Sequence, residues 1–162
     1  MNLDKASRVI NNVLMFIGGS FLVGMILLTS TNIFVRIFWV PISGVYELMG
    51  FFGAITTAFA LGYTQRTKGH IAVDVLIDTF SPRTRRGIET VNNLISAVFF
   101  GLISWMLVEK GLVLQRSGEV TETLRIIYYP FTFGAALGCA VLTFVLFVDL
   151  LLNLYKRNGA AE

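Results

Sequence analysis

Four long runs without a charged residue constrain the fold of this chain more than any other feature. They lie between Arg8 and Arg36, between Glu47 and Arg66, between Glu89 and Glu109, and between Arg125 and Asp149. An uncharged apolar run of about 18 residues or more can cross a bilayer as a helix. We therefore predict four transmembrane helices at about residues 9–35, 44–64, 88–114 and 126–154.

These runs leave no room for a separate soluble domain. Only 14% of the 162 residues are charged, whereas about a quarter are charged in an average soluble domain. We expect an all-α integral membrane protein, with residues 1–162 forming a single four-helix domain made of two hairpins. The net charge of +3 comes from Lys and Arg beside the spans, so no nucleic-acid partner is expected.

The central polar segment, residues 65–87, separates the two hairpins. It holds the only histidine, His70, and Asp74 follows four residues later, on the same face of a helix. Apolar residues occupy the opposite arc of residues 71–80, which favours a short amphipathic segment at the membrane surface. With no second histidine or cysteine nearby, a structural pairing of His70 with Asp74 is preferred to a metal site.

The end of this segment carries a helix start signal followed by a cluster of arginines. Ser81 and Pro82 are typical of an N-cap and the first helical residue. Arg83, Arg85 and Arg86 follow at the level expected for lipid headgroups, where they can bind anionic lipid.

The distribution of Lys and Arg predicts the orientation of the chain. Nine lie at the termini or in the central segment, and four lie in the two other loops: Lys5, Arg8, Arg66, Lys68, Arg83, Arg85, Arg86, Lys156 and Arg157 against Arg36, Lys110, Arg116 and Arg125. Because positive residues are retained on the cytoplasmic side, we expect both termini and the central segment in the cytoplasm.

Small residues are spaced for close helix packing in three spans. They are Ser20 and Gly24 in the first span, Gly50, Gly53, Ala54, Ala58 and Gly62 in the second, and Gly134 and Gly138 in the fourth. In lipid, close backbone approach replaces the hydrophobic drive that holds helices together in water. We expect these faces to contact a neighbouring helix or a partner subunit.

The first turn and the start of the second span carry the remaining singled-out residues. Trp39 is expected at the membrane interface, and Ser43 is expected to cap the second helix. Glu47 is the only charge of that span. Either the helix N-terminus favours its carboxylate, or it forms an ion pair with Arg36 or with a partner subunit.

The residues that catalysis or ion coupling would need are missing from the spans. No span contains a histidine, no carboxylate lies at a span centre, and the single Cys139 cannot form a redox pair. We expect a structural or accessory subunit that is not an enzyme and holds no cofactor. Two alternatives are a small homodimeric multidrug-type exporter, which needs a glutamate that the first span lacks, and a stand-alone membrane assembly protein.

The central segment resembles the small permease subunit (the DctQ-like Q subunit) of tripartite ATP-independent periplasmic transporters, known as TRAP transporters. The matching residues are Lys68, Gly69, His70, Ile71, Val73, Asp74, Leu76, Ser81, Pro82, Arg83, Arg85 and Arg86, with Arg36, Trp39, Pro41 and Glu47 upstream. The family often has paired acids where this chain has Tyr46 and Glu47. Chain length, span number and orientation agree with the family.

The resemblance implies a place in a bacterial inner membrane and a set of partners. The chain would pair with a larger multi-span permease subunit that holds the substrate and sodium sites. A periplasmic binding protein would deliver an organic acid, such as sialic acid or a C4-dicarboxylate, and a sodium gradient would drive uptake. The small subunit would act as a scaffold and assist docking of the binding protein.

Overall fold

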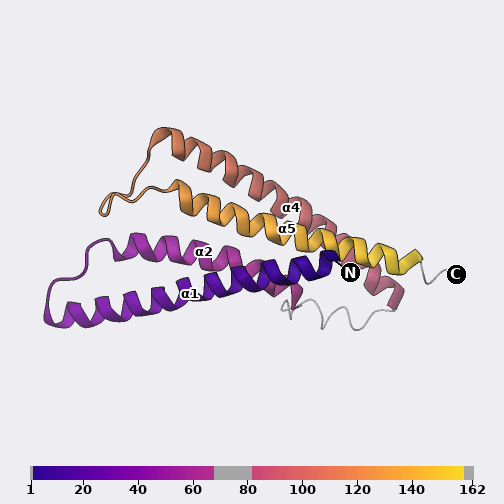
Figure 1. Cartoon of the computed structure of the whole chain (residues 1–162), viewed down its shortest axis with the longest axis horizontal. Coiled ribbons are helices and arrows are strands. Elements are labelled where there is room, and N and C mark those ends of the chain that lie inside the picture. The colour runs from indigo at the N-terminus through magenta and orange to yellow at the C-terminus, as the bar shows by residue number, and fades with distance from the viewer. Residues whose placement is uncertain (1, 68–81, 159–162) are drawn as a thin grey trace.

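The computed structural model describes residues 2–67 and 82–158, and these ranges contain four helices (Figure 1). They are α1 (Asn2–Phe38), α2 (Val45–Arg66), α4 (Pro82–Ser117) and α5 (Tyr129–Asn158). Each is long and apolar enough to cross a membrane. The prediction of an all-α protein with four spanning helices is therefore confirmed.

The starts of α1 and α5 and the cap of α2 differ from the sequence prediction. The first span was expected from about residue 9, but α1 begins at Asn2. The fourth span was expected from residue 126, but α5 begins at Tyr129, because the N–H of Tyr128 is donated to the Glu119 carbonyl at 3.4 Å. Gly44, not Ser43, caps α2, with φ of 78° and no side-chain capping bond. The Leu124 side chain fills the space that a Cβ at Gly44 would need.

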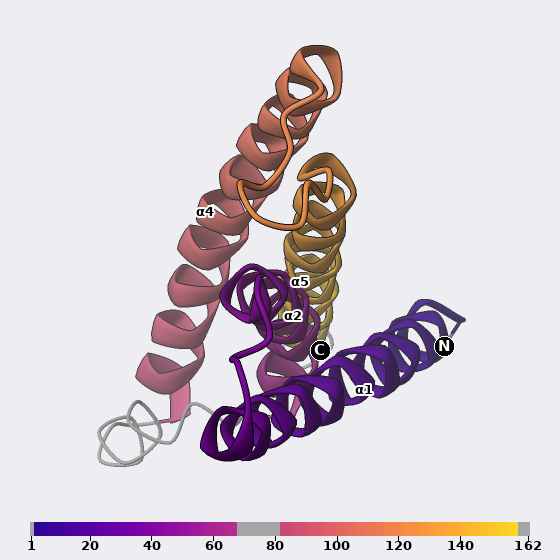
Figure 2. The same ribbon diagram turned by 90° about the vertical axis from the view of Figure 1, so that its left-hand side faces the viewer.

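The helices form two antiparallel hairpins that meet along α2 and α5 (Figures 1 and 2). The apolar windows of α2 and α5 are 33% and 39% buried, against 11% for α1 and 0% for α4. The outer helices α1 and α4 therefore lie on opposite flanks of a central pair. The turns 39–44 and 118–128 lie together at one end, called here the loop end, and both termini lie at the other (Figure 1).

Small residues bring α2 and α5 into close contact. A Cβ added at Gly138 would lie 2.5 Å from the backbone oxygen of Ala58, and one at Gly134 would collide with the Ile55 side chain. Nearer the loop end, the rings of Phe51 and Phe131 stack with centroids 4.0 Å apart. The contact between the two hairpins therefore requires glycine on α5.

Side-chain hydroxyls join each outer helix to its neighbour. The Thr56 hydroxyl of α2 donates to the Gly18 carbonyl of α1 at 3.2 Å, and the Ser104 hydroxyl of α4 donates to the Ala136 carbonyl of α5 at 3.0 Å.

Nearer the N-terminus of α1, the side chain of Asn11 is buried, and its Oδ1 has no hydrogen-bond donor in the described residues. That oxygen lies where a side chain on Gly62 would be.

Candidate functional site

The carboxylate of Glu47 fastens the two hairpins together at the loop end. Its Oε1 accepts the backbone N–H of Thr123 at 2.7 Å, and its Oε2 accepts that of Leu124 at 3.0 Å. The hydroxyls of Thr121 and Thr123 also hydrogen-bond the carboxylate. Among the described residues no ion pair joins Glu47 to Arg36. We call this arrangement the clasp: Glu47 on α2 with the backbone of Thr123 and Leu124.

The loop held by the clasp, residues 118–128, has a fixed shape of its own. The N–H of Thr121 donates to the Ile126 carbonyl at 2.9 Å, and the N–H of Ile126 donates back to the Thr121 hydroxyl at 3.1 Å. Arg125 adopts a φ of 54° to close the turn between them. Thr121 is buried. The loop therefore presents two adjacent N–H groups to a single carboxylate.

A groove of about 460 Å³ opens beside the clasp, between α2, α4 and α5. Glu47 and Thr121 line it at the loop end, together with Tyr128. Further along the helices its lining is apolar apart from Thr132, whose hydroxyl donates to the Tyr128 carbonyl. The apolar lining residues are Gly50, Phe51, Ala54, Leu107, Phe131 and Ala135. A Cβ added at Gly50 would meet nothing within 4 Å. The groove thus has one carboxylate at the loop end of a mostly apolar lining.

The five small residues of α2 predicted to form one packing face divide among different surroundings. Ala58 and Gly62 face neighbouring helices inside the chain, against Gly138 and Asn11. Gly50 and Ala54 line the groove. Gly53 does not line the groove, and a Cβ added there would meet nothing within 4 Å. Gly50 and Gly53 are therefore the glycines of this set where an added side chain would meet nothing within this chain.

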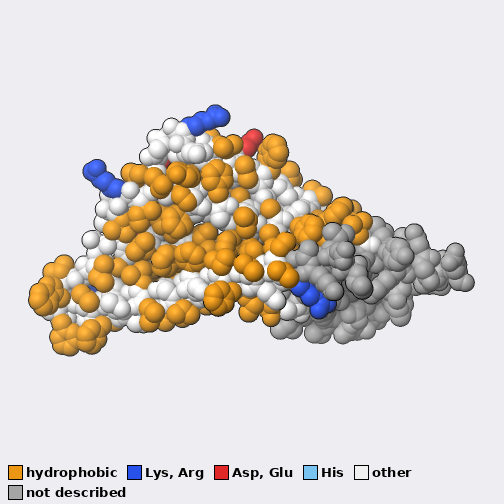
Figure 3. Space-filling view, in the orientation of Figure 1, with side chains coloured by type: hydrophobic (Ala, Val, Ile, Leu, Met, Phe, Trp, Pro, Cys, Tyr) orange, Lys and Arg blue, Asp and Glu red, His pale blue; other side chains and the backbone are white. Residues whose placement is uncertain are grey.

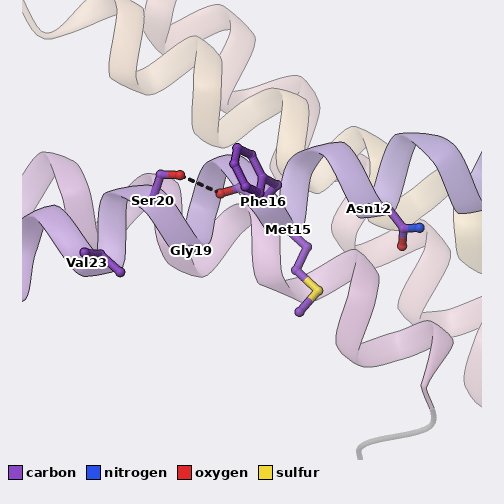
Figure 4. Close-up of a pocket in the computed structure, with 6 residues that line it drawn as sticks. All are labelled: Asn12, Met15, Phe16, Gly19, Ser20 and Val23. Carbon is purple, nitrogen blue, oxygen red and sulfur yellow. Dashed lines mark hydrogen bonds between the residues drawn. The ribbon is translucent and has the colours of Figure 1, made fainter.

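The outer side of α1 carries a second hollow, of about 680 Å³ (Figure 4). Its six lining residues all belong to α1: Asn12, Met15, Phe16, Gly19, Ser20 and Val23. The Ser20 hydroxyl points back to the Phe16 carbonyl at 2.9 Å (Figure 4). Ser20 therefore lies on the exposed side of α1, whereas Gly24, predicted to share its packing face, lies beside the Phe52 ring of α2.

The remaining predicted residues lie at the two ends of the protein. Arg36 is in the last turn of α1, and Trp39 follows it with 80% of its surface exposed. Pro82 begins α4, as its sequence context predicted. His70, Asp74 and Ser81 lie outside the described residues, as do the side chains of Arg83, Arg85 and Arg86, so their roles stay predictions.

Sequence reasoning singled out Glu47 but missed its actual partners. Thr123 and Leu124 lie 76 and 77 residues further along the chain, and they contribute backbone N–H groups, which leave no trace in side-chain patterns. The one usable signal was a lone carboxylate inside a span, because such a group is normally paired.

The fold and these sites define a small multi-pass membrane protein whose helix faces remain largely open, without a cluster of potential metal ligands in residues 2–67 and 82–158. The family model described as "Tripartite ATP-independent periplasmic transporters, DctQ component" matches residues 25–155. The chain therefore belongs to the DctQ family, the small permease component of TRAP transporters. No curated protein and no solved structure matches it.

Proposed function

We propose that this chain is the small membrane subunit of a sodium-driven importer that receives an organic acid from a periplasmic binding protein. The observation that carries this proposal is the family match over residues 25–155. The chain would scaffold and stabilise a larger permease subunit in a bacterial inner membrane. Sialic acid and C4-dicarboxylates are the substrate classes considered. Sodium and substrate would bind the large subunit, and no catalysis is expected in this chain.

The open helix faces support a scaffold role. Large apolar side chains of α4, among them Phe99, Leu102 and Trp105, have more than half of their surface exposed. Hydrophobic side chains cover much of the surface shown in Figure 3. A helix that is apolar on its outer side needs either lipid or another membrane helix against it. Two such flanks give a larger subunit ample surface for contact.

The distribution of cations supports an orientation with the loop end in the periplasm. Among the Lys and Arg residues in the described ranges 2–67 and 82–158, those that lie towards the loop end are Arg36, Lys110, Arg116 and Arg125. Positive residues remain on the cytoplasmic side, so both termini would be cytoplasmic. The clasped loop 118–128 would then face the binding protein, and its fixed shape suits a docking surface.

The proposal is tested by recovering the chain, tagged at its C-terminus, from native membranes in mild detergent. Mass spectrometry is expected to find a much larger multi-span protein in equal amount. Reconstitution of the pair with the binding protein should then give organic-acid uptake that depends on a sodium gradient. Recovery of this chain alone, or as a homodimer, would contradict the scaffold role.

Leucine at Gly53 is expected to reduce recovery of the large subunit several-fold. Gly53 is open in the structure, so the added side chain has room within this chain and would obstruct a partner helix that approaches closely. The measurement is the ratio of the two subunits after affinity purification. Gly87→Leu is the matched control, because Gly87 is equally open but lies near the start of α4. An unchanged ratio for Gly53→Leu would exclude this face.

A further inference from the structure

We propose that the turn between α1 and α2 lies in the interfacial layer of the membrane and anchors the loop end there. The anchoring surface, called here the tip, consists of Ile37, Phe38, Trp39, Val40 and Ile42. Its occupant is the boundary between lipid headgroups and acyl chains. The inference extends the interfacial position expected for Trp39 to the whole turn. It depends neither on the partner subunit nor on the transported substrate.

The side chains of the tip point away from the rest of the chain. Between 69% and 80% of the surface of each of Ile37, Phe38, Trp39 and Val40 is exposed. Apart from the indole N–H of Trp39, residues 37–42 carry no polar side-chain atom. Hydrophobic side chains cover this end of α1 in Figure 3, at the lower left. A continuous apolar patch of this kind marks a surface that meets something other than water.

Hydrogen bonds within the turn satisfy backbone donors that would otherwise keep it in water. The N–H of Trp39 donates to the Val35 carbonyl at 2.7 Å, and the N–H of Ile42 donates to Oδ1 of Asn32 at 3.0 Å. Pro41 has no N–H to satisfy. Because an unsatisfied backbone group is costly outside water, these bonds allow the turn to enter an apolar layer. Asn32 is therefore a positioning residue for the tip.

The length of α1 also favours a tip that stays at the membrane surface. The apolar stretch Ser7–Phe38 has 32 residues, which is about 48 Å at about 1.5 Å per residue. The hydrocarbon layer is only about 30 Å thick. A helix of excess apolar length is accommodated by tilting, and Figure 2 shows α1 running obliquely to α2 and α5. The tilt keeps the apolar end of α1 near the interface.

The second loop at the same end has the opposite composition. Residues 118–128 include Glu119, Glu122 and Arg125, all exposed, and these charges favour water. Arg36 precedes the tip, and its long side chain can reach lipid phosphates while its stem stays on apolar surface. The two hairpins would therefore meet the membrane surface differently, with the tip in the interfacial layer and residues 118–128 in water.

Tryptophan fluorescence of the full chain in phospholipid vesicles tests the depth of the tip. The chain has two tryptophans, Trp39 and Trp105, so Trp105→Phe leaves Trp39 as the single reporter. We expect lipids brominated on their acyl chains to quench Trp39, because its ring lies beside them. Aqueous iodide should quench it several-fold less than a reporter in residues 118–128.

The matched control for this measurement is Glu122→Trp in a chain that also carries Trp39→Phe and Trp105→Phe. Glu122 is exposed at the same end of the protein, so this reporter should be open to iodide and little affected by brominated lipid. Equal iodide quenching of the two reporters would overturn the proposal.

Asn32→Ala tests the backbone argument. Loss of the amide leaves the N–H of Ile42 without the acceptor that lies at 3.0 Å, so the turn should move towards water. Iodide quenching of Trp39 in the Trp105→Phe chain should then rise several-fold. Asn12→Ala is the control, because Asn12 is an exposed asparagine of α1 remote from the turn. Equal quenching in the two variants would show that Asn32 does not position the tip.

Cross-linking in native membranes tests whether a protein covers the tip instead. A photoreactive benzophenone side chain replaces Val40, which is exposed, so the packing of the helices is left intact. We expect mass spectrometry to find this residue joined to phospholipid. The same side chain in place of Glu122 should give no lipid adduct. Cross-links from position 40 to another protein, without lipid adducts, would mean that a partner covers the tip and would overturn the proposal.

Discussion

Alanine at Gly138 is expected to destabilise the subunit more than any other single methyl group added to its helices. The new Cβ would lie 2.5 Å from the Ala58 carbonyl oxygen and 2.6 Å from its carbon. Both are backbone atoms, so no side-chain rotation relieves the contact and α2 must move away from α5. Overpacking of this kind costs about 1–3 kcal/mol. A lowered midpoint of thermal unfolding in mild detergent would measure it.

Gly53→Ala is the matched control for this prediction. The two glycines lie in the interiors of facing helices, but a Cβ at Gly53 meets nothing within 4 Å. Alanine favours the helix by up to about 1 kcal/mol over glycine, so this variant should unfold at an equal or higher temperature. If Gly138→Ala were as stable as Gly53→Ala, the close approach of α2 and α5 would not hold the hairpins together.

The helices of this fold could be predicted because each leaves a signal that needs no partner. Uncharged runs give four spans, and Ser81 with Pro82 marks the start of α4. The ends were less accurate. The start of α5 is set by the pairing of residues 119–121 with residues 126–128, and a short turn of this kind has too few residues for periodicity to detect.

The surroundings of individual residues could be predicted only in part. Spacing identified Gly134 and Gly138 as packing residues, but it gave no means of telling that they face Ile55 and Ala58. Spacing also placed Gly50, Gly53 and Ala58 on one smooth face, although they meet a groove, open space and α5. A stripe of small residues predicts that another element packs closely against the helix, but it does not identify that element.

Removal of the Glu47 carboxylate is expected to release the loop between α4 and α5. In Glu47→Ala the N–H groups of Thr123 and Leu124 lose the acceptors that lie at 2.7 and 3.0 Å. Bonds to a carboxylate are roughly twice as strong as neutral ones, and no other described acceptor is in contact with these two groups. Amide hydrogen exchange of a peptide covering residues 118–128 should therefore accelerate about tenfold or more.

The control for this variant is Glu122→Ala, which removes an exposed carboxylate from the same loop and leaves the clasp intact. Its exchange should match that of the unmodified chain. The two hairpins also pack along Gly138 and Ala58, away from the clasp, so they would keep this packing while the loop loosens. Unchanged exchange in Glu47→Ala would mean that the turn closed by Thr121 and Ile126 holds the loop without the clasp. If exchange in Glu47→Ala is faster while recovery of the large subunit is unchanged, the loop is not needed to bind the permease. The loop surface proposed to meet the binding protein would then be distinct from the helix faces proposed to meet the permease.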